Sequence, residues 1–164
     1  MKRAFAAVVG LVVSWGSGAL AADCDGRPSA TRLIVHVAGM RAAVGEVAIT
    51  VYPDDPRRFL AHKGKLLRVR TPTHLPVTTA CFWLPQPAAY AIAIYHDANA
   101  DHDFNRTLTG LPSEGFGFSN NPSTRFGLPP FKAVRFNAGP GETTVHVTLR
   151  YLGKAERASS APVQ

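Results

Sequence analysis

Apolar and polar residues alternate along most of this chain, and this period of two restricts its fold more than any other feature. Successive side chains of a strand point to opposite faces, so alternation places one face in a core and the other toward water. The pattern predicts seven strands, in residues 33–37, 47–51, 67–69, 77–84, 90–94, 131–136 and 143–151.

Turn-forming residues separate these segments at short intervals. The chain has 14 glycines and 13 prolines, and no comparable stretch has the 3.6-residue stripe of an amphipathic helix. We therefore expect an all-β fold, a single-domain β-sandwich of the immunoglobulin-like or transthyretin-like type. The domain is expected to span residues 22–152. Residues 153–164 contain few apolar side chains and are expected to be a disordered tail.

The N-terminus has the pattern of a secretory signal peptide. Lys2 and Arg3 precede a short apolar run and then small residues ending at Ala21, which predicts that residues 1–21 are removed. An uncleaved anchor is the alternative, but the apolar run is well short of the ~20 residues needed to span a bilayer. We expect a periplasmic or secreted product with no transmembrane segment in the mature chain.

The two cysteines, Cys24 and Cys81, would then lie in an oxidising compartment, where an even number favours a disulfide. In the alternative, Cys81 is a buried small apolar residue and Cys24 lies in a frayed terminus. A thiolate metal site is disfavoured because no CxxC or Cys/His ligand spacing is present.

The segment between residues 96 and 131 is much longer than the ~2–5 residues of an ordinary hairpin connection, so we expect one long crossover loop that carries function. Oxygen-bearing side chains occupy alternate positions at its start, and alternate spacing in a turning loop lets such ligands converge on a hard cation such as calcium. The predicted calcium ligands are Asp97, Asn99, Asp101, Asn105 and Glu114.

This loop departs from the EF-hand pattern, because His102 and Leu108 stand where a loop starting at Asp97 needs glycine and glutamate. An alternative without metal is also open, in which the Asp and Asn side chains cap turns by accepting hydrogen bonds from nearby backbone amides.

Two runs, YAIAIYHDANADHDFN (residues 90–105) and GLPSEGFGFSNN (residues 110–121), resemble the signature of a bacterial exported family, the domain of unknown function 2141. The resemblance extends from about residue 33 to residue 151, and it implies a β-sandwich outside the cytoplasm with no established activity. That family usually has glycine at the position of His102 and aspartate at that of Asn105, so both departures weaken the metal affinity that the resemblance implies.

The block from Glu114 to Asn121 interleaves aromatic residues with glycine. It predicts a recognition loop, in which Phe116 and Phe118 pin the backbone and polar side chains are displayed to a ligand. The alternative is a rigid structural crossover. The candidate binding residues are His96, Phe116, Phe118, Ser119, Asn120 and Asn121.

The usual catalytic motifs, GxSxG, HExxH and a phosphate-binding loop, are missing from the sequence. We therefore expect a non-catalytic binding or accessory module for a protein or glycan of the cell envelope, with calcium as its cofactor. One alternative is a metal-dependent, hydrolase-like enzyme that uses His96, Asp97 and Glu114. Another is a purely structural envelope interaction protein.

Basic residues concentrate between residues 57 and 70. Exported proteins do not normally meet nucleic acid, so an anionic envelope component is one possible partner of this stretch. The simpler interpretation is that Arg68 and Arg70, on either side of Val69, form the solvent face of an edge strand, where charge discourages aggregation.

Overall fold

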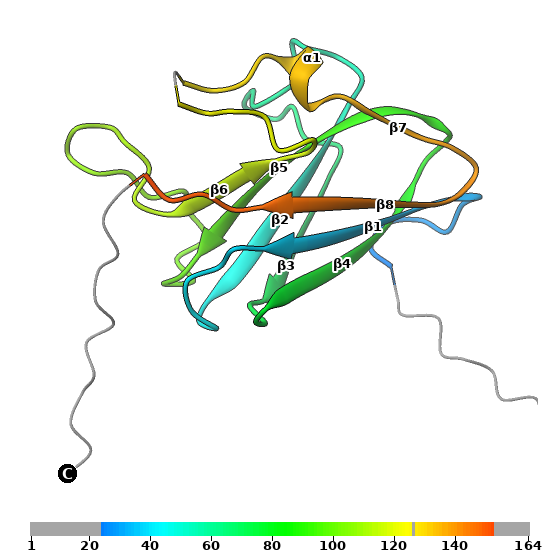
Figure 1. Cartoon of the computed structure of the whole chain (residues 1–164). Helices are drawn as coiled ribbons and strands as arrows, with labels where there is room; N and C mark the ends of the chain where they lie inside the picture. The colour runs from blue at the N-terminus through cyan, green and yellow to red at the C-terminus, as the bar shows by residue number, and fades with distance from the viewer. Residues whose placement is uncertain (1–23, 126, 153–164) are drawn as a thin grey trace, which may run out of the picture.

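The computed structural model describes residues 24–125 and 127–152, which form two β-sheets packed face to face (Figure 1). The predicted signal peptide and the predicted tail lie outside the described residues. The three-stranded sheet has the order β4-β1-β8, and the five-stranded sheet has the order β3-β2-β5-β6, with β7 also paired to β5. The elements are β1 (Thr31–Ala38), β2 (Glu46–Pro53), β3 (Leu67–Pro72), β4 (Val77–Leu84), β5 (Ala88–Asp97), β6 (Gly115–Phe118), α1 (Phe131–Val134), β7 (Phe136–Ala138) and β8 (Gly141–Thr148).

The core lies between the two sheets and is made by the predicted alternation. Leu33, Val35 and Val37 of β1 are fully buried, while the residues between them are partly exposed. They pack with the inward residues of β2, β5 and β8 in one cluster. The expected single-domain β-sandwich is therefore confirmed.

The outer face of the five-stranded sheet is also covered, which simple alternation does not predict. The outward residues Ala48, Thr50 and Tyr52 of β2 are buried, as is Ala91 of β5. A second apolar cluster, which includes Tyr52, Ala91, Phe116, Phe118 and Val134, lies on this face. The sandwich thus has one outer face in solvent and one face under loops.

Two expectations for the chain after β5 are wrong. Residues 131–136 are not one strand, because the chain forms the short helix α1 after Pro130 and enters β7 only at Phe136. Phe131 and Val134 are three residues apart, so a helical turn directs both into the outer cluster. The single long loop is divided in two, residues 98–114 and 119–130, because β6 pairs with β5 between them (Figure 1).

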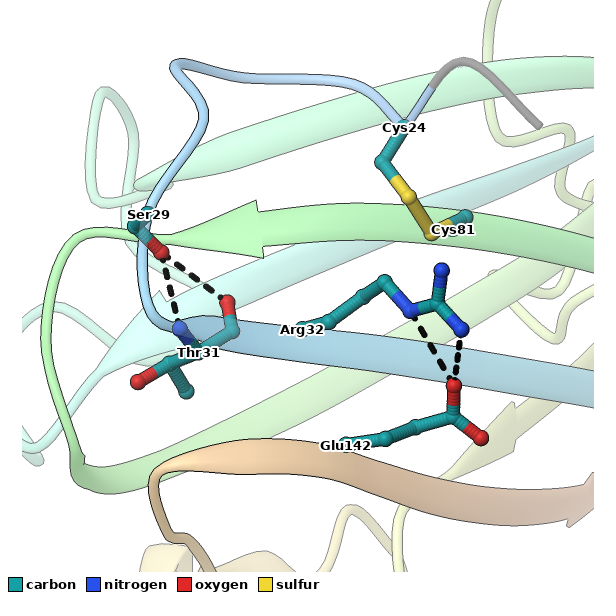
Figure 2. The surroundings of a disulfide bond; sticks show 6 residues. All are labelled: Cys24, Ser29, Thr31, Arg32, Cys81 and Glu142. Atoms are coloured by element: carbon teal, nitrogen blue, oxygen red, sulfur yellow. Dashed lines mark hydrogen bonds and ion pairs between the residues drawn. A yellow bond between two sulfur atoms is a disulfide. The ribbon is translucent and has the colours of Figure 1, made fainter. Parts of the chain in front are cut away.

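The expected disulfide between Cys24 and Cys81 is present, with the two Cα atoms 4.5 Å apart (Figure 2). It joins the start of the described chain to β4, next to the Asp25 and Phe82 bridge. Beside it on the same outer face, Arg32 of β1 is paired with Glu142 of β8. Within the described part of the chain, no helix is long and apolar enough to cross a membrane.

Candidate functional site

The covered outer face has a floor of small side chains between larger ones. Arg68, Thr50, Ala93 and Phe118 are consecutive partners across β3, β2, β5 and β6. Strand pairing therefore places them in one row, although they are far apart in sequence. The side chains of Thr50 and Ala93 are small and those of Arg68 and Phe118 are large, so the row forms a depression in the outer face of the sheet.

The alternation of glycine and phenylalanine in β6 is explained by the two faces of this strand. Gly115 and Gly117 face inward, where a Cβ atom on Gly117 would lie 2.8 Å from Cγ1 of Val147, and one on Gly115 would overlap the ring of Tyr151. Phe116 and Phe118 point the other way, into the outer cluster. The glycines thus let β6 lie against β8 and its extension, while the phenylalanines build the outer face.

A cavity of about 450 Å³ lies above this floor. Both loops that follow β5 help to enclose it, through Phe104 and Leu111 of the first loop and Leu128 of the second. Most of its described lining residues are apolar or aromatic, and the predicted binding residues Phe116 and Phe118 are among them. The size and lining are those of a small-molecule site.

Two arginines, Arg68 and Arg106, are the charged residues among those described around this cavity. Arg68 is exposed, and its Nε donates a hydrogen bond of 2.7 Å to Oγ1 of Thr50. Arg106 is also exposed; its Nη1 donates to the carbonyl of Gly110 at 3.1 Å, and its Cζ lies 5.2 Å from the centroid of the Phe104 ring. Polar contacts thus hold both side chains at the solvent side of an apolar chamber.

The acidic loop is fastened to the sheet by Asp97, whose side chain is fully buried at the end of β5. Its Oδ2 accepts a hydrogen bond from Nη1 of Arg70 at 2.7 Å and one from the backbone amide of His102 at 2.9 Å. Its Oδ1 accepts one from the backbone amide of Asp101 at 3.1 Å. Arg70 also donates to the Tyr95 hydroxyl at 2.6 Å. The Asp97 and Arg70 pair therefore holds together the loop, the edge strand β3 and Tyr95, which lines the cavity.

Asp101 organises the middle of the loop. Its Oδ2 accepts hydrogen bonds from Nδ2 of Asn105 at 2.9 Å and Nδ2 of Asn99 at 2.7 Å, and its Oδ1 accepts one from the backbone amide of Asp103 at 2.9 Å. The hydrogen bond from Asn105, with those from Asp103 and Asn99, lowers the pKa of Asp101.

Glu114 closes the loop from the far end. It is buried, and its Oε2 accepts a hydrogen bond of 3.2 Å from the backbone amide of Asn105. Burial raises the pKa of Glu114 to about 7, and the nearby charges of Asp97 and Asp101 act in the same direction. Oδ1 of Asn105 is buried and has no hydrogen-bond partner in the described structure.

Hydrogen bonds within the loop thus link the five predicted oxygen ligands. Among the described residues, no group of three or more His, Cys, Asp or Glu side chains is arranged to hold a metal ion. Asp97 and Asp101 accept hydrogen bonds from N–H donors, which is the turn-capping arrangement of the alternative without metal.

His96, a predicted binding residue, faces the interior. Its side chain is buried, its Nε2 lies 2.8 Å from the carbonyl oxygen of Val44, and its Nδ1 lies 2.7 Å from the hydroxyl of Tyr151. Both ring nitrogens are therefore occupied on the inner side of β5, away from the outer-face cavity.

Of the three polar residues expected to be displayed, Ser119 is not displayed, whereas Asn120 and Asn121 are exposed. Ser119 is fully buried and accepts a hydrogen bond of 2.9 Å from the amide of Ile92. Asn120 is exposed, but its Nδ2 donates to the carbonyl of Arg135 at 2.9 Å.

The side chain of Asn121 is bonded to β8. Its Nδ2 donates to the carbonyl of His146 at 3.0 Å, and its Oδ1 accepts from the amide of Thr148 at 2.8 Å. This asparagine, like its two neighbours, thus fixes the backbone of other elements, which agrees with the structural alternative for the block.

Sequence reasoning missed most of the pocket, including Thr50, Tyr52, Ala93, Tyr95 and Arg106. A signal was available, because the outward positions of β2 and β5 hold small or aromatic residues where a solvent-facing strand would have charged ones. That departure indicates a covered outer face.

Comparison with known proteins gives one match. A family model described as an uncharacterized protein conserved in bacteria (DUF2141) matches residues 35–146, which include the acidic loop and β6. No curated protein and no solved structure matches the chain.

Proposed function

This chain belongs to the bacterial family named domain of unknown function 2141, and we propose that it is an exported, non-catalytic module that binds a small, largely apolar ligand. The cavity above Ala93 carries this proposal. Export is supported by the disulfide, which is characteristic of oxidising compartments, and by the predicted signal peptide.

Several features favour binding at this cavity. Its volume of about 450 Å³ falls within the range of roughly 300–1,000 Å³ that is typical of ligand sites. The hydrogen bonds of Arg70 to Asp97 and Tyr95 tie the acidic loop to the floor. The rings of Phe104 and Tyr95 also pack against each other, with centroids 5.3 Å apart. A covering loop held in this way keeps the chamber formed before a ligand arrives, which reduces the cost of binding.

The chemistry of the lining favours binding over catalysis. Among the described lining residues, the titratable side chains are tyrosines and arginines, which leaves no carboxylate, imidazole or thiol there to act as a base or nucleophile. The hydrolase alternative would use His96, Asp97 and Glu114. His96 and Asp97 are already engaged by Tyr151, Val44 and Arg70.

A neutral fluorescent probe tests the proposal. N-phenylnaphthylamine should bind the purified protein with a rise in fluorescence, and Ala93→Phe should weaken this binding at least about tenfold because the new ring fills the floor of the cavity. Ala43→Phe is the matched control, since Ala43 is exposed and is not among the residues lining the cavity. Equal probe affinity in Ala93→Phe and the parent would overturn the proposal.

Calcium on the acidic loop is a second candidate function. The buried Oδ1 of Asn105, without a hydrogen-bond partner in the described residues, is the observation that favours it. Glu114 lies beside it and would gain from a neighbouring positive charge, because its pKa is raised. Calcium would have to displace the amide donors of Asn99 and Asn105 from Asp101.

Thermal unfolding in calcium and in chelator decides this second candidate. Bound calcium stabilises the native state by RT ln(1 + [L]/Kd), about 2.7 kcal/mol at a hundredfold excess over Kd. Asp101→Asn should reduce the stabilisation, whereas Asp103→Asn, in the same loop but outside the predicted ligand set, should not. Identical melting curves in calcium and chelator would exclude the metal. Absence of both probe binding and a calcium effect would favour the structural envelope protein instead.

A further inference from the structure

The positive charge of the residues that line the cavity narrows the class of ligand that it can bind. We infer that the cavity selects an aromatic organic anion, whose ring system lies over Thr50 and Ala93 and whose acidic group contacts Arg68 and Arg106. This inference rests on the proposed function, because it assigns a ligand class to the same cavity.

The first step concerns the two guanidinium groups. Both are held by neutral partners, the Thr50 and Tyr52 hydroxyls for Arg68 and the Gly110 carbonyl for Arg106. Neither has a carboxylate within 4 Å among the described residues. By contrast, Arg70 and Arg135 are paired with Asp97 and Asp54. The positive charge at the cavity is thus not compensated by nearby acids.

The second step concerns what such groups bind. A guanidinium has five N–H donors in a planar fork that matches a carboxylate or sulfonate. Arg68 and Arg106 each keep donors beyond those already used. Both arginines line the same cavity, Arg68 from the edge strand β3 and Arg106 from the covering loop, so an anion bound there would lie in the field of two guanidinium groups. Charge-assisted hydrogen bonds are stronger than neutral ones.

The third step concerns the body of the ligand. Aromatic rings continue from the loop to the sheet in edge-to-face contact, with centroids 6.1 Å apart for Phe104 and Phe116 and 6.1 Å apart for Phe116 and Phe118. Tyr95 joins them at Phe104. Rings in this geometry offer both edges and faces to a flat guest. The small floor residues leave space for that guest beside them, so a planar aromatic body suits the chamber better than a flexible chain.

The test uses two probes with the same aromatic skeleton, neutral N-phenylnaphthylamine and the anionic anilinonaphthalene sulfonate. The parent should bind the sulfonate more tightly than the neutral probe. Replacing both Arg68 and Arg106 by Gln should lower the preference for the sulfonate over the neutral probe by about tenfold or more. The matched control replaces Arg27 and Lys132, both exposed and both outside the lining residues, by Gln. It removes the same net charge and should change neither affinity.

The possible failures separate the two proposals. If the neutral probe binds and Ala93→Phe blocks it, but the arginine substitutions leave the preference for the sulfonate unchanged, the anion assignment is wrong and the binding pocket stands. If neither probe binds the parent, the binding function itself is overturned. In a competition arm, naphthoate should displace the sulfonate at lower concentration than decanoate does. Equal displacement by decanoate would overturn the aromatic part of the inference.

Discussion

At the residue scale, one buried carboxylate determines where the acidic loop lies. The Asp97 side chain is 0% exposed and that of Arg70 is 19% exposed, so the ion pair is shielded from water. Removing one partner of a buried pair costs about 3–5 kcal/mol, because the other charge is left without compensation. Arg70 also donates a hydrogen bond of 2.8 Å to the carbonyl of His102. The start of the loop is therefore held by more than its own turns.

Glu114 gives this loop a pH dependence whose sign can be predicted. Burial raises its pKa from 4.5 to about 7 in the folded protein, so between these values the native state binds more protons than the unfolded state. Its contribution to the free energy of unfolding is full below about pH 4.5 and is lost as the pH rises toward 7, with a slope of at most about 1.4 kcal/mol per pH unit. Glu114→Gln, which cannot ionise, should remove this slope and be more stable than the parent above pH 7.

Urea unfolding across this pH window measures the effect. The matched control is Glu142→Gln, which removes an exposed carboxylate on β8, on the opposite sheet, and should keep the parent's slope. If the stability of Glu114→Gln runs parallel to that of the parent across the window, the proposed pH dependence is wrong. Added calcium would reduce the slope only if the ion binds beside this carboxylate, so the same titration also bears on the metal proposal.

At the element scale, β6 contributes to both the core and the outer face of the five-stranded sheet, because its inward residues are glycines and its outward residues are phenylalanines. Its glycines admit the side chains of Val147 and Tyr151 on the inner face, while Phe116 and Phe118 form part of the cavity lining on the outer face. Backbone hydrogen bonds between Phe116 and Arg150 add contact with the chain after β8. A strand of only four residues thus contributes to both the core and the site.

Gly115→Ala tests this close approach. The added methyl group would overlap the Tyr151 ring, and relieving such overpacking typically costs about 1–3 kcal/mol. Gly139→Ala is the matched control, because a Cβ there meets nothing within 4 Å and should change the free energy of unfolding by less than about 0.5 kcal/mol. Chemical denaturation of the two variants measures the difference. Equal stability would mean that β6 does not depend on this contact.

The sequence predicts the strands whose inward residues are apolar and alternate along the chain, including β2 and β5, whose outer face is also covered. In β1 and most of β8, one face is in the core and the other is at least partly exposed, so apolar periodicity is sufficient to find them. It is insufficient for β6, whose inward side chains are glycines, and for residues 131–136, whose apolar residues enter a cluster outside the core. In both segments, contacts with distant elements determine the structure.

The candidate site also has one part that local sequence predicts and one part that depends on contacts between distant elements. The five oxygen-bearing residues of the acidic loop lie within 18 positions, from Asp97 to Glu114, so local spacing was enough to select them, and the structure links them by hydrogen bonds within the loop. Arg68, Thr50 and Ala93 become neighbours only through strand register. Strand register depends on the pairing of the whole sheet and cannot be read from a local motif. Local pattern therefore predicted the loop but not the pocket beneath it.

At the scale of the whole molecule, the outer faces of the two sheets carry different features. The three-stranded sheet carries the disulfide and the Arg32 and Glu142 ion pair on its exposed side (Figure 2). The five-stranded sheet carries the second apolar cluster and the cavity on its own outer face, on the opposite side of the sandwich. Covalent stabilisation and the proposed ligand site are thus separated by the full thickness of the core.

That separation predicts how the protein responds to loss of its disulfide. Cys24 and Cys81 are 57 positions apart, and releasing a loop of this length should lower the free energy of unfolding by about 4 kcal/mol in the chain-entropy model. Replacing both cysteines by Ser should therefore shift the urea midpoint strongly to lower concentration. Affinity for N-phenylnaphthylamine should stay within about twofold of the parent under native conditions, because β4 contributes no residue to the described lining. A folded double variant that has lost the probe would show that the disulfide acts on the cavity through the core, and the two faces would then have to be treated as one coupled unit.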